Sequence, residues 1–180
     1  MNRLREKSVP PVYGYSIWLR PAAEHCRILQ ESIHLLSSAL LGPIFTPHIT
    51  LLGQLRLAEH DIIPKFRTLS RGIYLKSVRV AGIGQQEQYY RALYLEIVKS
   101  RQLEVLNHNA RNIFDLPDEP PFFPHLSLYY GYRSSSLKEK ALKLLPQHFP
   151  DRLEIVSIDL VHTEGEVNAW EVVERVNPIK

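Results

Sequence analysis

The feature that most constrains the fold of this chain is a seven-residue motif that occurs twice. Residues 45–51 read FTPHITL and residues 122–128 read FFPHLSL, so phenylalanine, proline, histidine, a hydroxyl residue and leucine recur in order. The motif histidines, His48 and His125, are 77 positions apart. This spacing is too long for a solenoid repeat and indicates two similar lobes. A pseudo-twofold relation between the lobes would bring both histidines to one cleft.

The apolar pattern predicts the same order of elements on either side of the midpoint. Strand, helix, motif strand, helix and strand are expected twice in succession, with one more strand at the end. Strands are expected at 12–19, 44–52, 73–83, 90–98, the second motif, 153–163 and 169–176, and helices at 22–40, 58–69, 100–114 and 137–145. Four prolines between 117 and 124 predict an irregular loop before the second motif.

Composition narrows the class of protein. The single cysteine, Cys26, excludes an internal disulfide framework and fits a reducing compartment. The longest apolar stretches have the length of a strand, so we expect a cytoplasmic protein without a membrane span. The net charge of +3 mildly favours a phosphate-bearing ligand. Basic residues do not form long runs, which argues against a surface that coats a polynucleotide.

Each motif places an imidazole and a hydroxyl on one face of its strand. Side chains two residues apart on a strand share a face, so His48 is expected beside Thr50, and His125 beside Ser127. Histidine moves protons near neutral pH, and a hydroxyl can donate to an oxyanion. Two such half-sites supply a base, an acid and two donors. This set suits in-line displacement at phosphorus, and the scheme requires neither a metal nor a cofactor.

Three other interpretations of the motifs are less favoured by the sequence. A single proline–histidine strand would more often be structural, and it is the second copy that favours chemistry. Metal ligation lacks an accompanying H-x-H, HExxH or carboxylate cluster. A serine-protease-like triad is disfavoured because Ser127 lies outside a G-x-S-x-G context.

The paired H-x-[T/S] motifs resemble those of the 2H phosphoesterase superfamily, and within it the plant- and yeast-type cyclic nucleotide phosphodiesterases. Supporting stretches are YSIW at 15–18, GPIF at 42–45, PHLSLYY at 124–130 and Trp170-Glu171. The resemblance implies one bilobal α+β domain over residues 1–180, with two antiparallel sheets lining a central cleft and helices outside.

The same resemblance implies metal-independent opening of 2′,3′-cyclic nucleotides or ADP-ribose 1″,2″-cyclic phosphate, leaving a 2′-phosphate. It also implies aromatic side chains that hold the base, and Tyr90 and Tyr130 fall at the matching places. Strand alternation instead favours Tyr129 as the neighbour of His125 and Ser127.

We therefore expect a monomeric cyclic phosphodiesterase in which His125 activates water and His48 protonates the departing ribose oxygen. Thr50 and Ser127 would donate hydrogen bonds to the phosphoryl oxygens. Two alternatives remain open from the sequence. One is a phosphodiesterase that acts on cyclic-phosphate RNA ends, and the other is a nucleotide-binding module without turnover.

Overall fold

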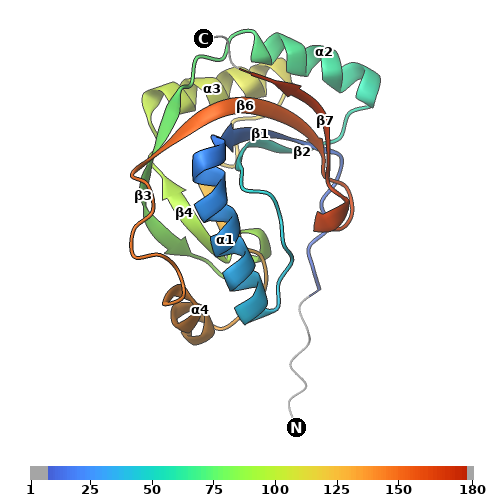
Figure 1. Ribbon diagram of the computed structural model, residues 1–180. Helices are drawn as coiled ribbons and strands as arrows, with labels where there is room; N and C mark the ends of the chain where they lie inside the picture. The colour runs from blue at the N-terminus through green and yellow to red at the C-terminus, as the bar shows by residue number, and fades with distance from the viewer. Residues whose placement is uncertain (1–7, 178–180) are drawn as a thin grey trace.

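A computed structural model describes residues 8–177, which form an α+β fold of four α-helices and seven strands (Figure 1). In chain order these are β1 (Tyr15–Pro21), α1 (Ala23–Leu40), β2 (Ile49–Leu55), α2 (Glu59–Ser70), β3 (Ser77–Gln85), β4 (Leu93–Ile97), α3 (Arg101–Ile113), β5 (His125–Tyr129), α4 (Ser135–Leu142), β6 (Arg152–His162) and β7 (Glu171–Val176). Short 3₁₀ turns occupy Tyr89–Arg91 and Val167–Ala169. The predicted doubled order of strands and helices is confirmed.

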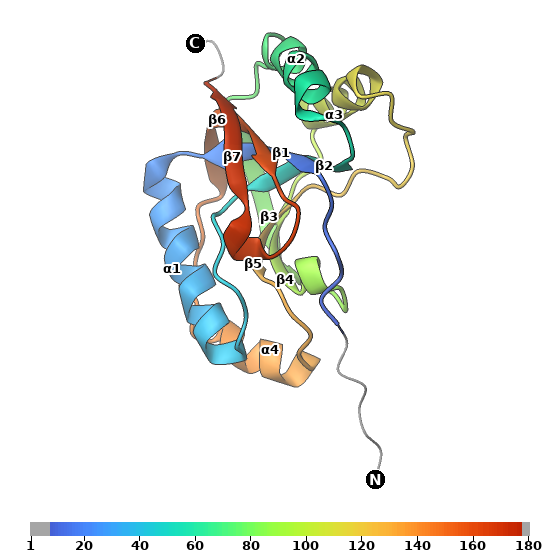
Figure 2. The same cartoon turned by 90° about the vertical axis from the view of Figure 1, so that its right-hand side faces the viewer.

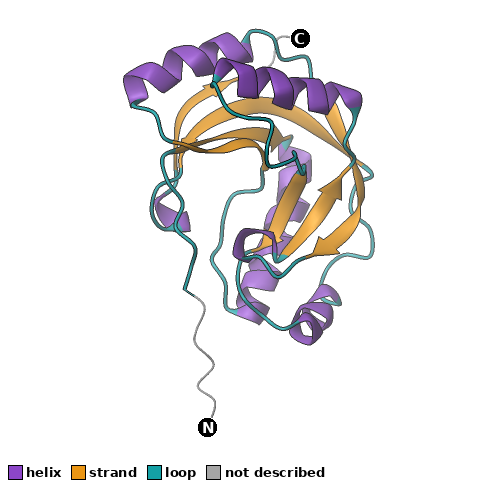
Figure 3. Ribbon diagram, turned by 180° about the vertical axis from the view of Figure 1, so that it is seen from behind, coloured by secondary structure: helices purple, strands orange, loops and turns teal. Residues whose placement is uncertain are grey.

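The strands are antiparallel and lie in the order β1-β2-β5-β4-β3-β6-β7. Strand β6 also pairs with β1, so six strands close into a ring and β7 extends it from β6. Figure 3 shows how strongly these strands curve. The expected α+β class and antiparallel strands are confirmed, and the structure adds that the two half-sheets are hydrogen-bonded to each other. Between the motif strands β2 and β5 the link is the residue pair Ile49 and Leu126.

The helices cross between the two halves of the duplication. Helix α1 lies between β1 and β2 in sequence but packs against β5, while α3 lies between β4 and β5 but packs against β2. The helices form the pairs α1–α4 and α2–α3, at opposite ends of the view in Figure 2. The apolar face of α1 is buried as its spacing predicts, at Leu29, Ile33, Leu36 and Leu40. Each motif strand is therefore supported by a helix of the other half.

Several strands, among them β1, β2, β3 and β4, begin three to five residues later than their sequence patterns predict. The first motif strand was expected from residue 44, but β2 begins at Ile49. Pro43 and Pro47 provide no backbone N–H, so the chain before Ile49 cannot make a regular ladder. The strand expected from residue 90 begins at Leu93, because Tyr90 lies in a 3₁₀ turn. Among the described residues, no helix is long and apolar enough to cross a membrane.

Candidate active site

One pocket of about 200 Å³ is lined by His48, Thr50, His125 and Ser127 together. The pairing of Ile49 with Leu126 explains this convergence. Continuing the antiparallel register places His48 opposite Ser127 and Thr50 opposite His125. Each histidine thus faces the hydroxyl residue of the other motif, and all four side chains point to the side away from Ile49 and Leu126, which are buried in the core.

The two imidazole rings are held in the same way. Nδ1 of His48 lies 2.7 Å from the Thr46 carbonyl oxygen, and Nδ1 of His125 lies 2.8 Å from the Phe123 carbonyl oxygen. Because a carbonyl only accepts, Nδ1 carries the proton in each neutral ring. The Nε2 atom of each ring is then an unprotonated nitrogen that can take up or return a proton. Matched tautomers are what an acid–base pair requires.

Burial keeps both histidines neutral when the pocket holds no ligand. Desolvation lowers the pKa of His48 to about 3, and the charge of Arg20 acts in the same direction. Desolvation likewise lowers the pKa of His125 to about 4, with the Arg91 charge adding to it. A bound phosphodiester anion favours the protonated form of a nearby imidazole and would raise these pKa values.

The two motif hydroxyls differ in their present hydrogen bonds. Ser127 Oγ donates to the Tyr90 carbonyl oxygen at 2.8 Å. The Thr50 hydroxyl has no hydrogen bond to any part of the chain that the structure describes. Thr50 can therefore donate to a ligand directly, whereas Ser127 must first release the Tyr90 carbonyl.

Tyr90 and Tyr130 both line the pocket. Tyr130 is only 3% exposed, and its ring stacks on Phe45 with centroids 3.8 Å apart. The Tyr90 ring is partly exposed, and its hydroxyl donates to the Pro10 carbonyl oxygen at 2.8 Å. Burial raises the pKa of Tyr90 to about 12, so its hydroxyl stays protonated near neutral pH. Of the two rings, Tyr90 has more surface available for a ligand.

The position expected for Tyr129 from strand alternation does not hold. Ser127 pairs with Tyr94, but the next pair in the ladder is Tyr129 with Leu93, which leaves Leu128 as a bulge. A bulge reverses the alternation of side chains beyond it, so Tyr130 rather than Tyr129 shares the face of Ser127.

Tyr129 instead belongs to the core. It is 1% exposed, and its hydroxyl donates to the Leu40 carbonyl oxygen at 3.1 Å. A side chain at Gly42 would place its Cβ 2.5 Å from the Tyr129 ring, so this glycine allows the close approach of the chain that leads to the first motif.

Among the pocket residues that were not singled out from the sequence as site residues are two tryptophans and an arginine. Trp18 stacks on His48 with ring centroids 3.6 Å apart and planes inclined by 10°, and Trp170 lies edge-on to Trp18. Arg91 is the one charged side chain among the described residues that line the pocket. Its guanidinium lies 5.3 Å from the Phe123 ring centroid and bonds Gln88. Both tryptophans lie in stretches that carried the resemblance, whereas Arg91 follows Tyr90 without a sequence signal of its own.

The described residues contain no group of three or more His, Cys, Asp or Glu side chains placed to hold a metal ion. The polar side chains of the pocket, apart from the indoles of Trp18 and Trp170, are the two imidazoles, the hydroxyl side chains, Gln54 and Arg91. These are groups that donate to, or exchange protons with, an anionic oxygen.

The fold and the paired-histidine pocket are those of a 2H phosphoesterase. Residues 13–177 match the family described as cyclic phosphodiesterase-like proteins, and the chain belongs to this family. A relative from Arabidopsis thaliana, described as a cyclic phosphodiesterase, is 23% identical over 127 residues, which cover 71% of this chain and 70% of the relative. The family and this relative support hydrolysis of cyclic phosphodiesters as the general activity.

Two bacterial proteins of solved structure have a similar fold. Escherichia coli LigT in complex with 3′-AMP superposes with a TM-score of 0.64 at 16% identity, covering 95% of this chain and all of LigT (100%). TT0787 of Thermus thermophilus superposes with a TM-score of 0.58 at 15% identity, and the match covers 92% of this chain and 97% of the TT0787 chain. At these identities the likeness establishes the fold alone.

Proposed function

We propose that this protein hydrolyses 2′,3′-cyclic nucleotides, or ADP-ribose 1″,2″-cyclic phosphate, and leaves the phosphate on the 2′ position (or its 1″,2″ counterpart). The observation that carries the proposal is the matched pair of imidazoles, His48 and His125, in one pocket with the hydroxyls of Thr50 and Ser127. The crossed packing of α1 on β5 and α3 on β2 supports a single catalytic unit built from both halves.

The reaction needs one proton removed and one delivered. Nε2 of His125 takes a proton from the attacking water as it adds to phosphorus. The bond from phosphorus to the ribose oxygen breaks on the opposite side, and Nε2 of His48 protonates that oxygen. The ring that begins as the acid must acquire a proton on substrate binding, which the negative charge of the phosphodiester favours.

Charge stabilisation falls to donors that line the pocket: the Thr50 hydroxyl can donate at once, and the Ser127 hydroxyl can donate after it leaves the Tyr90 carbonyl oxygen. Thr50 and Ser127 donate to the non-bridging phosphoryl oxygens, and Arg91 brings a positive charge to the pocket edge. Fixed donors in a site shielded from water stabilise developing negative charge without reorganisation. Neither the hydroxyls nor the guanidinium consumes a proton in this scheme.

The nucleobase is expected against the aromatic side of the pocket, formed by Tyr90 and Trp170, whose ring centroids lie 6.2 Å apart. Nucleotide binding is consistent with this fold, since LigT has been crystallised with 3′-AMP, ATP and NADP⁺. Stacking on aromatic rings tolerates any base, so the pocket favours cyclic nucleotides over base-free cyclic phosphates without demanding one base.

The proposal is tested with a panel of 2′,3′-cyclic mononucleotides, ADP-ribose 1″,2″-cyclic phosphate and oligonucleotides ending in a 2′,3′-cyclic phosphate, each assayed with and without EDTA. The expected result is turnover of the small substrates to 2′-phosphates (1″- or 2″-phosphates for the ADP-ribose compound), unchanged by EDTA. Turnover confined to the oligonucleotides would assign the protein to RNA ends. Loss of turnover with EDTA that a divalent ion restores would contradict the proton-transfer scheme.

A further inference from the structure

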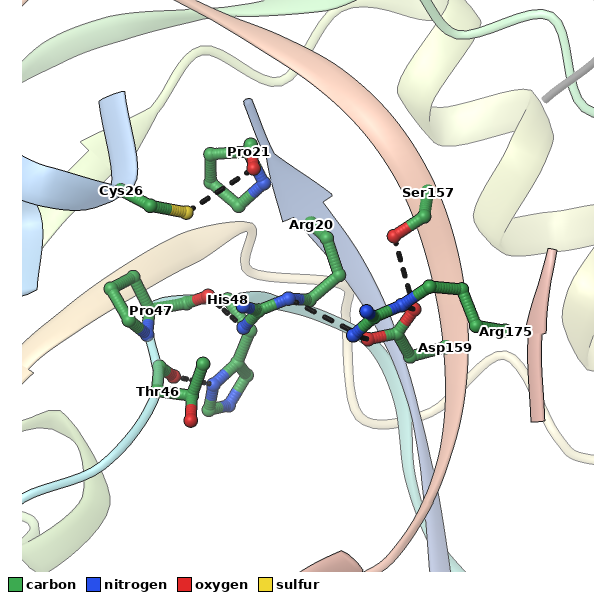
Figure 4. A network of polar contacts seen from close by, with 9 residues as sticks. All are labelled: Arg20, Pro21, Cys26, Thr46, Pro47, His48, Ser157, Asp159 and Arg175. Atoms are coloured by element: carbon green, nitrogen blue, oxygen red, sulfur yellow. Dashed lines mark hydrogen bonds and ion pairs between the residues drawn. The ribbon is translucent and has the colours of Figure 1, made fainter. Parts of the chain in front are cut away.

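A carboxylate behind the first motif is completely buried and bound by two arginines (Figure 4). Asp159 on β6 is 0% exposed. Arg175 on β7 makes a two-point contact with it, from Nε at 2.8 Å and from a terminal nitrogen at 2.6 Å, and Ser157 Oγ donates at 3.0 Å. Nε of Arg20 on β1 lies 3.5 Å from the same carboxylate. A buried charge with this many partners has a fixed position.

Arg20 connects this carboxylate to the backbone beside His48. One terminal nitrogen of its guanidinium donates to the Pro47 carbonyl oxygen, and Figure 4 shows the guanidinium between Asp159 and Pro47. The preceding carbonyl, on Thr46, accepts from the His48 ring at 2.7 Å. Both carbonyls that precede His48 are therefore occupied, one by the imidazole itself and one by Arg20.

In the second motif, the corresponding carbonyl is held by a backbone hydrogen bond alone. The Pro124 carbonyl, which precedes His125 as Pro47 precedes His48, accepts from the backbone N–H of Ile97 at 3.2 Å. Ile97 is the last residue of β4. No side chain is needed there.

The register of the strands shows why the first motif differs. Leu19 pairs with Ile49 as Leu95 pairs with Leu126, so the residue two positions further on is Pro21 in one half and Ile97 in the other. Proline has no backbone N–H. The donor that holds the second motif is therefore missing from the first, and the guanidinium of Arg20 takes its place.

We propose that Arg20, anchored by Asp159, is the positioning residue for His48. It holds the Pro47 carbonyl, and through it the His48 backbone, in the place that a strand hydrogen bond occupies in the second motif. This proposal rests on the function proposed above, in which the place of the His48 imidazole matters for proton transfer. A misplacement of about 1 Å can lower a rate by roughly 100-fold.

Arg20 also contributes to the charges that face His48. The pKa of His48 is lowered by burial first, then by the charges of Arg20 on β1 and of His125 on β5. Asp159 on β6 and Arg175 on β7 lie behind Arg20 and compensate each other in part. Removing the guanidinium should therefore raise the pKa of His48 and leave that of His125 unchanged.

The test compares Arg20→Met, which has neither donor nor charge, with Arg20→Lys, which keeps a cation and a donor but lacks the planar fork. Glu96→Ala is the matched control, because Glu96 is exposed and pairs with His125 in the place that corresponds to Arg20. Arg20→Met should lower kcat by about 10- to 100-fold with little change in KM. Arg20→Lys should lie between it and the wild type, and Glu96→Ala should match the wild type.

The second readout is the pKa of each histidine, followed by NMR from the ring proton between the two nitrogens. In Arg20→Met the His48 pKa should rise while the His125 pKa stays constant, which a general loss of stability would not produce. Wild-type kcat together with an unchanged His48 pKa in Arg20→Met would overturn the proposal. Should Arg20→Met not fold, Arg20→Lys decides, since wild-type kcat in that variant contradicts the need for a two-point guanidinium.

Wild type and His48→Ala are run in the same assay to separate this inference from the proposed function. Turnover by the wild type that is lost in His48→Ala supports the proposed function. When this result is obtained, the kcat values of the Arg20 variants test whether Arg20 positions His48. Absence of turnover in the wild type contradicts the function itself, and with it the positioning role that depends on it.

Discussion

Ile49 and Leu126 pair across β2 and β5, and each is the residue that directly follows a motif histidine. Because the strands are antiparallel, this pair lies on the pseudo-twofold axis that relates the motifs. Both side chains are completely buried, so the register cannot slip by one residue without turning the imidazoles into the core. The core contact thus determines that the two histidines share one pocket.

The two hydroxyls should differ in their contribution. Thr50→Ala is expected to lower kcat by roughly 100-fold, since a preorganised donor to an oxyanion is worth about 3–4 kcal/mol at most. Ser127→Ala should have a smaller effect, because the Ser127 hydroxyl must give up its bond to the Tyr90 carbonyl before it donates. Steady-state kinetics on a 2′,3′-cyclic nucleotide measure both values. A larger loss in Ser127→Ala would reverse this assignment.

Arg91 should contribute to substrate binding through its charge. Arg91→Met is expected to lower kcat/KM by about 10- to 100-fold, since a hydrogen bond to a charged group is worth about 1.5–3 kcal/mol. The loss should shrink at high ionic strength, where charges are screened. The assay is repeated at low and high salt. Arg133→Met serves as the control, because Arg133 lies outside this pocket and donates to the Leu40 carbonyl oxygen. Equal losses in the two variants would remove Arg91 from the site.

The two pocket tyrosines should separate into a binding residue and a packing residue. Tyr90→Leu is expected to raise KM for cyclic nucleotides by about 5- to 100-fold, as stacking is worth about 1–3 kcal/mol per base, and to affect a base-free cyclic phosphate less. Tyr130→Leu should mainly lower the melting temperature, because its ring is stacked on Phe45. Equal losses on base-bearing and base-free substrates in Tyr90→Leu would show that the base is recognised elsewhere.

Acid should destabilise the fold through His48. Its pKa is about 3 in the folded chain and about 6.5 when unfolded, so the unfolded state binds the extra proton between these values. The stabilisation is complete above pH 6.5 and is lost as the pH falls below it, by up to about 1.4 kcal/mol per pH unit. Denaturant unfolding between pH 4 and pH 7 should therefore show a flatter pH dependence for His48→Gln than for wild type. The same pH dependence of the unfolding free energy in both proteins would contradict the low pKa of His48 and indicate that its imidazole is hydrated.

The apolar pattern was sufficient to predict the doubled order of strands and helices, and the α+β fold class came from the family resemblance. The meeting of four motif side chains in one pocket was expected from the duplicated motif, because it follows from repetition and strand alternation. The place of Tyr129 was not predictable, since it depends on the bulge at Leu128, which is a property of the ladder between β4 and β5. The late start of β2 at Ile49 is explained by Pro43 and Pro47, which provide no backbone N–H, although the apolar pattern predicted a strand from residue 44. The bond from Arg20 to the Pro47 carbonyl joins residues that are distant in sequence, and only the folded chain reveals it.

The most direct test of the account is the turnover of a 2′,3′-cyclic nucleotide by His48→Ala and His125→Ala. His60→Ala is the control, because the His60 side chain is 81% exposed on α2. Removing a positioned acid or base is expected to lower kcat by about 10²- to 10⁴-fold in each motif variant, and the control should keep the wild-type rate. Near-normal turnover in either motif variant, with the fold intact by circular dichroism, would contradict the paired-histidine mechanism.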